Sequence, residues 1–520
     1  MAKKVNLDAL IPREDFEIQE SPGVGKKIET ISIENIQADA FFYVNIRKPD
    51  FQRETNEWDS QKICEFITSF IEGDLIPAII LWRSPSGYLF IIDGSHRLSS
   101  LSAWVNDDYG DGQTSKLFYD GSITEEQENI AQTTRKLVEK NIGSYENFRL
   151  AQRDPSKVSE NVRKYAKNLA ALAIQLQWVE GDASKAESSF FKINQQAAPI
   201  DKTELKLLKS RKKPNSIAAR AIIRSGKGHK YWSSFSNEIQ NQIQQIATEI
   251  HQMLFEPKLQ TPIKTMDVPL AGKLSSRQAL ALVLDFVNIV NNIDFNDKNI
   301  SDDETGLETL KFIKEVQKIA YRLNSNYPSS LGLHPIVYFY SKEGRYRTVS
   351  FLAVVDFVMK LINTQKINNF IEVRNQFETL LIENDYLIKQ IYEKHRSTQK
   401  SYKPLSDFFL QIIITLKENQ DIFSAINSVA SRDNFKYLNI RKEILPKNSS
   451  TSKNKFSSNQ KSEIYIKEAL NKTPRCKICH GFLHSSSISI DHIKRKADGG
   501  LATIDNGQLT HPYCNTTFKN

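Results

Sequence analysis

Two pairs of residues near the C-terminus have the types and the spacing of ligands to a structural metal ion. The pairs are Cys476-x-x-Cys479 and His511-x-x-Cys514, and they hold three of the four cysteines in the chain. Thiolate sulfur and imidazole nitrogen are the usual ligands of tetrahedral zinc sites. Because such a small terminal segment buries little apolar surface, a metal ion would help it to fold. We therefore expect Cys476, Cys479, His511 and Cys514 to hold a structural Zn²⁺.

Two further histidines compete with His511 for the fourth zinc position. His480 and His484 lie close to the first cysteine pair, but the spacing of His511 to Cys514 mirrors that pair and favours His511. The run Cys476-x-x-Cys-His480 is also the attachment pattern of c-type haem, which we disfavour because no export signal is evident. A zinc ribbon that only binds DNA or protein would share these pairs. Such a ribbon would not need the polar residues described next.

Acidic, imidazole and amide side chains follow in an order that could assemble a catalytic site. Residues 487–493 alternate as a strand does, and this strand would carry Asp491 and His492 at its end. A turn and a second short strand would then bring in Asn506, and a helix would carry Asn515. The order strand, loop, strand, helix therefore predicts that these four side chains converge.

The residues and their intervals resemble those of the HNH, or ββα-metal, nuclease family. His492 and Asn506 are fourteen positions apart, and Asn506 and Asn515 are nine apart. The resemblance covers about the last 50 residues of the chain. It implies a metal-dependent endonuclease that leaves 5′-phosphate and 3′-hydroxyl ends, most readily on DNA.

The resemblance also implies a role for each polar residue. Asp491 and Asn515 would hold a catalytic Mg²⁺ or Mn²⁺, since hard divalent cations prefer oxygen ligands and can stabilise a phosphate under attack. His492 would be the general base, because a neutral imidazole can accept a proton from water near pH 7. Asn506 would fix the loop and orient that imidazole.

A second group of polar residues, Asp93-Gly94-Ser95-His96-Arg97, follows an apolar run and opens a helical pattern. A turn at this place would direct a helix N-terminus and two cationic side chains toward a phosphate. Asp-Gly is also a favoured tight turn, so these five residues alone favour a structural role.

The motifs around this group resemble the ParB/sulfiredoxin-like domain of GmrSD-type modification-dependent restriction proteins. Phe51-Gln52-Arg53 precedes the group, and a segment with Asn194 follows it. The family signature is an Asp-Gly-Gln-Gln-Arg-like motif, in which this chain has Ser95 and His96 at the two glutamine positions. The resemblance implies binding or hydrolysis of a nucleotide, or sensing of DNA. The residues expected around a nucleotide phosphate are Arg53, Asp93, His96, Arg97 and Asn194.

The elements that must position these residues predict an α+β multidomain chain. Strand-like runs at 78–82 and 88–92 and a helical pattern at 59–71, which Asp59 or Ser60 could cap, indicate an N-terminal α/β domain. A large, mostly α-helical middle region follows, and a small zinc-stapled ββα-metal module ends the chain. The expected boundaries are 1–27 for an N-terminal extension, 28–211 for the ParB-like domain, 212–445 for the helical domain, 446–462 for a flexible linker and 463–520 for the HNH domain.

Composition and charge agree with a nucleic-acid partner. Residues 446–520 contain twelve Lys and Arg against five Asp and Glu, so they carry +7 of the net charge of +9. A basic module on a near-neutral body suits binding of a phosphate backbone, although a solubilising tail would look the same. We find neither a long apolar run nor a secretory signal, so we expect a cytoplasmic protein with no membrane partner.

Three functional hypotheses follow. The leading one is an anti-phage endonuclease whose HNH module cuts DNA. Its ParB-like domain would gate or target cleavage through a nucleotide, such as a nucleoside triphosphate, or through a DNA modification, as in modified phage DNA. A second is a nucleotide-regulated DNA-binding protein with a structural or inactive HNH module. A third is an RNA-directed nuclease. Because one HNH site cuts one strand, a homo-oligomer is one route to double-strand breaks.

Overall fold

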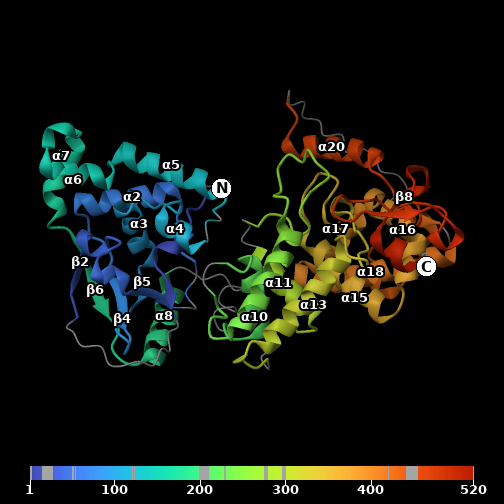
Figure 1. Ribbon diagram of the computed structural model, residues 1–520, viewed down its shortest axis with the longest axis horizontal. Coiled ribbons are helices and arrows are strands. Elements are labelled where there is room, and N and C mark those ends of the chain that lie inside the picture. Colours follow the sequence, from blue (N-terminus) through green and yellow to red (C-terminus); the bar gives the residue numbers. More distant parts are fainter. Residues whose placement is uncertain are drawn as a thin grey trace. The chain divides into compact units, whose positions relative to one another are not determined.

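The protein divides into two compact units (Figure 1). In the computed structural model, the described residues are 3–14, 27–49, 52, 54–119, 121, 123–197, 210–227, 230–274, 279–294, 300–419, 421–440 and 455–518. The first unit consists of Met1–Arg211 and Lys227–Tyr231, and the second of Lys212–Gly226 and Trp232–Asn520.

A mixed sheet forms the centre of the first unit. Its described strands lie in the order β1-β3-β5-β4-β6-β2. They are β1 (Arg13–Glu14), β2 (Thr30–Ser32), β3 (Ile46–Pro49), β4 (Ile79–Arg83), β5 (Leu89–Asp93) and β6 (Ala173–Trp178). Parallel pairs join β1 to β3, β3 to β5 and β4 to β6, whereas β4–β5 and β2–β6 are antiparallel. The predicted N-terminal α/β domain is thus confirmed.

Helices connect these strands and cover the sheet. They are α1 (Phe41–Val44), α2 (Ser60–Glu72), α3 (Ser95–Val105), α4 (Gln113–Phe118), α5 (Glu125–Asn141), α6 (Tyr145–Arg153), α7 (Glu160–Leu169) and α8 (Ala183–Ala197), with short 3₁₀ turns at Asp8–Leu10, Ile33–Ile36 and Pro155–Lys157. The predicted helix at 59–71 is α2, and the Asp59 side chain caps it by accepting a hydrogen bond from the backbone N–H of Lys62.

The central strands bury both faces of the sheet. Leu89 and Ile91 belong to a large core shared with α2, α3 and α5, which lie over one side of the sheet in Figure 1. Phe90 and Ile92 face the other way into a smaller core that includes Phe190 of α8. Continuous apolar strands are expected where helices cover both faces.

The described part of the predicted N-terminal extension belongs to the same unit. Residues 3–14 include β1, and Leu7 and Leu10 are buried in the large core. Asp8 forms a buried ion cluster there, with Oδ2 accepting from Arg13 Nη1 (2.5 Å) and Oδ1 accepting from Lys48 Nζ (2.8 Å). The extension therefore contributes a strand and buried charges to the domain.

The second unit is mainly helical. Its main helices are α10 (Pro214–Ile223), α11 (Asn237–Phe255), α12 (Ala279–Val290), α13 (Leu307–Leu323), α14 (Pro335–Phe339), α15 (Thr348–Asn363), α16 (Ile367–Glu383), α17 (Asp385–His395), α18 (Thr398–Asn419) and α19 (Ile422–Ala430), followed by a 3₁₀ turn at Asp433–Phe435. Apolar residues at helical spacing form its core. Phe377 of α16, for example, lies 5.7 Å from Phe357 of α15 and 5.5 Å from Phe409 of α18 between ring centroids.

The C-terminal module packs within this second unit. It contains α20 (Ser458–Lys472), the antiparallel strands β7 (Ser489–His492) and β8 (Gly507–Thr510), 3₁₀ turns at Lys496–Asp498 and Ile504–Asn506, and a final π-helical segment, Cys514–Phe518. The predicted order of strand, strand and helix is confirmed. Residues 446–454 of the predicted linker lie outside the described residues. The last residues of that predicted linker belong instead to the start of α20, which Ser457 caps through a capping box.

A search for membrane-crossing segments covers the described helices. Not one of them combines the length and the apolar character that a bilayer span requires.

Candidate active site and metal centre

Three cysteines and a histidine come together at the base of the C-terminal module. The ligand atoms of Cys476, Cys479, His511 and Cys514 all lie within 4.8 Å of one another, and all four residues are buried. The backbone N–H of Ile478 points to Cys476 Sγ (3.4 Å), as in a metal-binding turn. The sequence-predicted tetrad is therefore assembled in the fold.

Hydrogen bonds prepare His511 as a ligand. Its Nε2 donates to the carbonyl of Phe482 (3.0 Å), while Nδ1 faces Cys479 Sγ at 3.3 Å. Burial lowers the pKa of the imidazole, so the ring is neutral near pH 7, as a metal ligand must be.

The close packing of the three cysteine thiols shifts their pKa values and favours a bound cation. Hydrogen bonds from Cys479 and Cys514 lower the pKa of Cys476, whereas Cys476 raises the pKa of Cys479 to about 12, and the neighbouring cysteines also raise that of Cys514. Three thiolates so close together repel one another, and a bound metal ion would relieve that repulsion. The donor set therefore fits a metal ion.

The two competing histidines lie elsewhere. His480 is exposed and has a left-handed backbone at φ 56°, where the chain leaves the first cysteine turn. His484 is buried, but its Nδ1 faces Asn324 Nδ2 (3.1 Å) and its Nε2 lies 3.4 Å from Asp267. Neither joins the tetrad.

Strand β7 buries a charged side chain and exposes an apolar one, which is the reverse of the usual burial pattern of a strand. Asp491 is only 7% exposed, whereas the preceding Ile490 is 63% exposed. The Asp491 Oδ2 atom accepts a hydrogen bond from Gln508 Nε2 of β8 (2.8 Å), across the ladder in which the two residues are paired. His492 ends the strand opposite Gly507. The sheet thus turns the Asp491 carboxylate inward, and the half-buried His492 follows it at the end of the strand.

Asn506 holds the loop that joins the two strands. Its side-chain Oδ1 accepts from the backbone N–H of Lys494 (2.7 Å), and its Nδ2 donates to the carbonyl groups of Lys494 (3.1 Å) and Leu501 (2.8 Å). These three bonds go to the loop backbone and agree with the predicted fixing of the loop.

Asn515 reaches β7 from the terminal helical segment. Its Nδ2 donates to Ser489 Oγ (2.7 Å) and to the carbonyl of Ile490 (3.3 Å). The backbone N–H of Asn515 bonds the carbonyl of His511, so the metal tetrad directly supports this segment. The fold therefore brings Asn515 to the strand that carries Asp491 and His492.

Sequence reasoning missed three polar residues around this centre. Gln508 contacts Asp491. The other two form a buried pair on α16: Glu378 contacts Phe482 at the end of the metal-binding turn (residues 476–482), and Arg374 contacts His511. The pair leaves a signal in the sequence, because both charges fall at helical spacing among apolar residues of α16.

The N-terminal motif forms one end of α3. Gly94 has φ +101°, and a Cβ there would lie 3.0 Å from Ile79 Cγ1, so both conformation and space favour glycine. Arg97 Nη2 bonds Asp93 Oδ2 (2.7 Å) and the Ala78 carbonyl (3.0 Å). One guanidinium nitrogen thus ties the turn to the chain at the start of β4, which agrees with the structural interpretation of the motif.

His96 links this helix to the segment that follows the Phe51-Gln52-Arg53 motif. Its ring stacks on Trp58 with centroids 5.6 Å apart, and its Nε2 accepts from the backbone N–H of Glu57 (3.3 Å). Asp93, His96 and Arg97 therefore lie at one site. Arg53 and the side chain of Asn194 lie outside the described residues.

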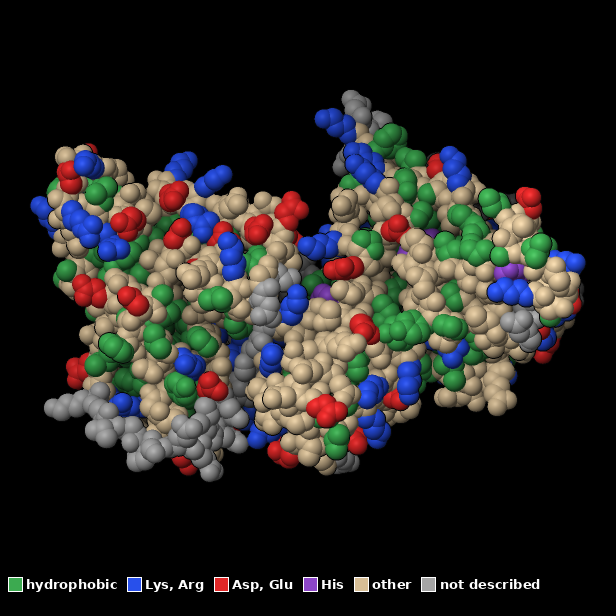
Figure 2. Space-filling model, viewed as in Figure 1, with side chains coloured by type: hydrophobic (Ala, Val, Ile, Leu, Met, Phe, Trp, Pro, Cys, Tyr) green, Lys and Arg blue, Asp and Glu red, His purple; other side chains and the backbone are tan. Residues whose placement is uncertain are grey.

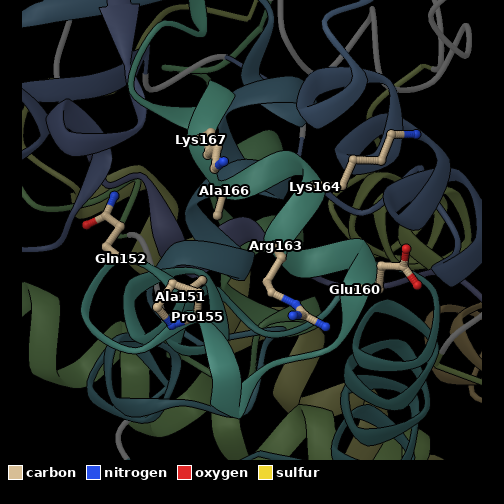
Figure 3. Close-up of a pocket in the computed structure, with 8 residues that line it drawn as sticks. All are labelled: Ala151, Gln152, Pro155, Glu160, Arg163, Lys164, Ala166 and Lys167. Carbon is tan, nitrogen blue, oxygen red and sulfur yellow. The ribbon is translucent and has the colours of Figure 1, made fainter.

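An open pocket of about 530 Å³ lies elsewhere in the first unit, between α6 and α7. Figure 3 shows its lining residues: Ala151, Gln152, Pro155, Glu160, Arg163, Lys164, Ala166 and Lys167. Figure 2 shows Lys and Arg side chains gathered over this end of the unit. The pocket is basic, and its lining does not include Asp93, His96 or Arg97.

Comparison with known proteins finds two family matches. Residues 31–211 match the GmrSD restriction endonuclease, N-terminal domain, and residues 476–520 match the HNH endonuclease. No curated protein and no solved structure matches the chain. The first match covers the motif at α3 and the mixed sheet apart from β1 and the first residue of β2, and the second covers the tetrad together with β7 and β8. The chain thus carries a GmrSD-type N-terminal domain joined to a C-terminal HNH endonuclease domain.

Proposed function

We propose that the protein is a metal-dependent HNH endonuclease that cleaves phosphodiester bonds in DNA. The observation that carries this proposal is the inverted pattern of β7, which buries Asp491 and exposes Ile490. A strand that served only packing would bury its isoleucines. A buried carboxylate next to a half-buried histidine in the sequence is instead what a metal-dependent hydrolytic site would need, with one residue to bind the cation and the other to take a proton.

The residues have distinct roles in this proposal. Asp491 and Asn515 offer the oxygen atoms that Mg²⁺ or Mn²⁺ prefers, and such a cation would stabilise charge on the phosphate and the leaving oxygen. His492 accepts the proton of the attacking water. Asn506 holds the loop beside the imidazole through its three backbone bonds.

The tetrad of Cys476, Cys479, His511 and Cys514 holds a structural Zn²⁺ in this proposal. Three sulfur ligands and one nitrogen ligand match the tetrahedral donor set of zinc. Such thiols stay reduced in the cytoplasm, where we place the protein.

The β7–β8 loop supports DNA as the substrate. Lys494, Arg495 and Lys496 are all exposed, and the loop directly follows Asp491 and His492. Cations at this place can bind the phosphates that flank the scissile bond. The proposed metal site acts on the phosphodiester bond, which DNA and RNA share, so RNA is the competing substrate.

We further propose that the GmrSD-type domain controls cleavage, through a nucleoside triphosphate or through modified DNA such as that of phages. His96 and Arg97 would lie against the phosphate, with Asp93 holding the Arg97 guanidinium, and nucleotide hydrolysis would be a second activity. A homo-oligomer would let two HNH sites cut opposite strands.

A plasmid-nicking time course with Mg²⁺ tests the proposal. Wild type and His492→Ala are compared on unmodified and hydroxymethylcytosine-containing DNA, with and without nucleoside triphosphates, beside an RNA substrate of equal length. Nicking of DNA by wild type alone supports the proposal. Preferred cleavage of RNA selects the RNA-directed nuclease, and tight DNA binding without nicking on any substrate selects the binding protein with an inactive module.

A further inference from the structure

A buried ion pair on α16 lies on the apolar side of the helix. The side chains of Arg374 and Glu378 have no exposed surface, and Arg374 Nε donates to Glu378 Oε1 at 2.7 Å. Burial of two charges is costly, and replacing such a pair with apolar residues is often neutral or stabilising. Packing of α16 alone therefore does not account for the pair.

Glu378 binds the metal-binding turn of the HNH domain. Its Oε2 accepts from the backbone N–H of Phe482 (2.7 Å), three residues after Cys479, while its Oε1 also accepts from the Tyr338 hydroxyl (3.0 Å). The carbonyl of Phe482 in turn accepts from His511 Nε2. A single residue, Phe482, thus joins α16 to a tetrad ligand through its backbone N–H and carbonyl.

Arg374 reaches the tetrad itself. Its Nη1 lies 3.2 Å from His511 Nδ1 and donates to the Leu331 carbonyl (2.5 Å), and its Nη2 donates to the Gly332 carbonyl (2.9 Å). These two carbonyl bonds keep the guanidinium in place when Nδ1 binds a metal ion. Its positive charge then stays beside the sulfur atoms.

Two glycines permit this close approach. A Cβ at Gly481 would lie 2.4 Å from Arg374 Nε, and a Cβ at Gly332 would lie 2.6 Å from His511 Cδ2. Gly332 also has φ +59°. The helical region and the metal-binding turn therefore fit together at backbone distance.

We propose that α16 supplies the outer part of the zinc site, with Arg374 and Glu378 as positioning residues for the tetrad. This inference rests on the zinc proposed for that tetrad. Zn²⁺ with three thiolates and a neutral imidazole carries a net charge of −1. The Arg374 guanidinium, which contacts His511 and is itself paired with Glu378, partly offsets that charge in a buried setting. The helical region thereby sets how firmly the nuclease domain holds its metal.

Zinc transfer from the full-length, zinc-loaded protein to a chromogenic chelator measures this role. Arg374→Met removes the charge but leaves Glu378 buried without its cation. Arg374→Met/Glu378→Gln removes both charges and keeps the packing volume. Arg374→Lys restores the charge alone. Arg347→Met is the matched control, because it breaks the Arg347–Asp385 ion pair (2.6 Å) elsewhere in the helical region.

We expect both methionine variants to release zinc at least about tenfold faster than wild type, the scale on which groups beside metal ligands act. Arg374→Lys should recover part of the loss, and Arg347→Met should release zinc as wild type does. Circular dichroism should show unchanged helix content in the double variant. Wild-type release by the double variant, or equal losses in Arg374→Lys and Arg374→Met, would overturn the inference. Purified wild type without zinc would instead overturn the zinc assignment, and this inference with it.

Discussion

At the scale of single residues, substitutions at Asp491 and His492 should reduce the nicking rate without reducing the zinc content of the protein. Asp491→Asn should abolish Mg²⁺-dependent nicking, because an amide is a poorer ligand for a hard cation than a carboxylate. His492→Ala should slow nicking by about 10² to 10⁴, the usual contribution of a general base. Both should keep their zinc content, measured by atomic absorption. Asp498→Asn is the control, since Asp498 lies in the same loop and pairs with Arg495 (3.1 Å). Equal activity of Asp491→Asn and Asp498→Asn would contradict the assignment.

A second residue-scale prediction concerns the buried charges around Asp8. Asp8→Asn would leave Arg13 and Lys48 buried without their carboxylate, which should lower the free energy of unfolding by about 3 to 5 kcal/mol. Urea unfolding followed by tryptophan fluorescence reports on this unit, since four of the five tryptophans lie within residues 58–178. Glu126→Gln, which breaks the exposed pair with Lys3, is the control and should change little.

Lys48 also gives the domain a defined pH dependence. Burial lowers the pKa of Lys48 to about 8 in the folded chain, against an ordinary value of 10.5. Between these two values the unfolded chain keeps a proton that the folded chain has released, so the free energy of unfolding should rise with pH. The urea midpoint of wild type should therefore increase from pH 7.5 to 9.5 relative to that of Lys48→Met. An identical pH response of the two proteins would contradict this.

At the scale of elements, the exposed β7–β8 loop is the part of the HNH domain best placed to hold DNA. Lys494→Glu/Lys496→Glu should weaken binding to a duplex about tenfold or more. It should also reduce the salt dependence of binding, because a protein that makes fewer phosphate contacts releases fewer counterions from the DNA. Fluorescence anisotropy at several salt concentrations measures both effects. Lys436→Glu, an exposed change in the helical region, is the control. An unchanged salt dependence in the loop variant would place the DNA elsewhere.

The elements differ in how far the sequence alone could predict them. Local patterns sufficed for α2, β4, β5 and α3, since caps and apolar spacing act over a few residues. The two-residue strand β1 escaped prediction, because only its pairing with β3 defines it. The tetrad and the ββα order followed from spacing. The contact between α16 and the metal-binding turn did not, because it joins Glu378 to Phe482, which are far apart in the chain.

At the scale of the whole molecule, the control of cleavage by the GmrSD-type domain is the property most open to test. Its phosphate-receiving site is proposed at Asp93, His96 and Arg97, where His96 also holds the segment that contains Glu57. A nucleotide bound there could change that segment through His96. The quantity to measure in the full-length protein is the ratio of nicking rates with and without nucleoside triphosphate.

His96→Ala should bring this ratio to one, because it removes both the imidazole at the proposed phosphate site and its hydrogen bond with the Glu57 backbone. His395→Ala is the matched control, since this histidine lies at the end of α17 in the other unit and should keep the wild-type ratio. Equilibrium binding of a fluorescent nucleotide to both variants separates lost binding from lost coupling. A wild-type ratio in His96→Ala would remove the α3 site from the control of cleavage. The basic pocket between α6 and α7 would then be the next surface of the unit to test, with Arg163→Ala.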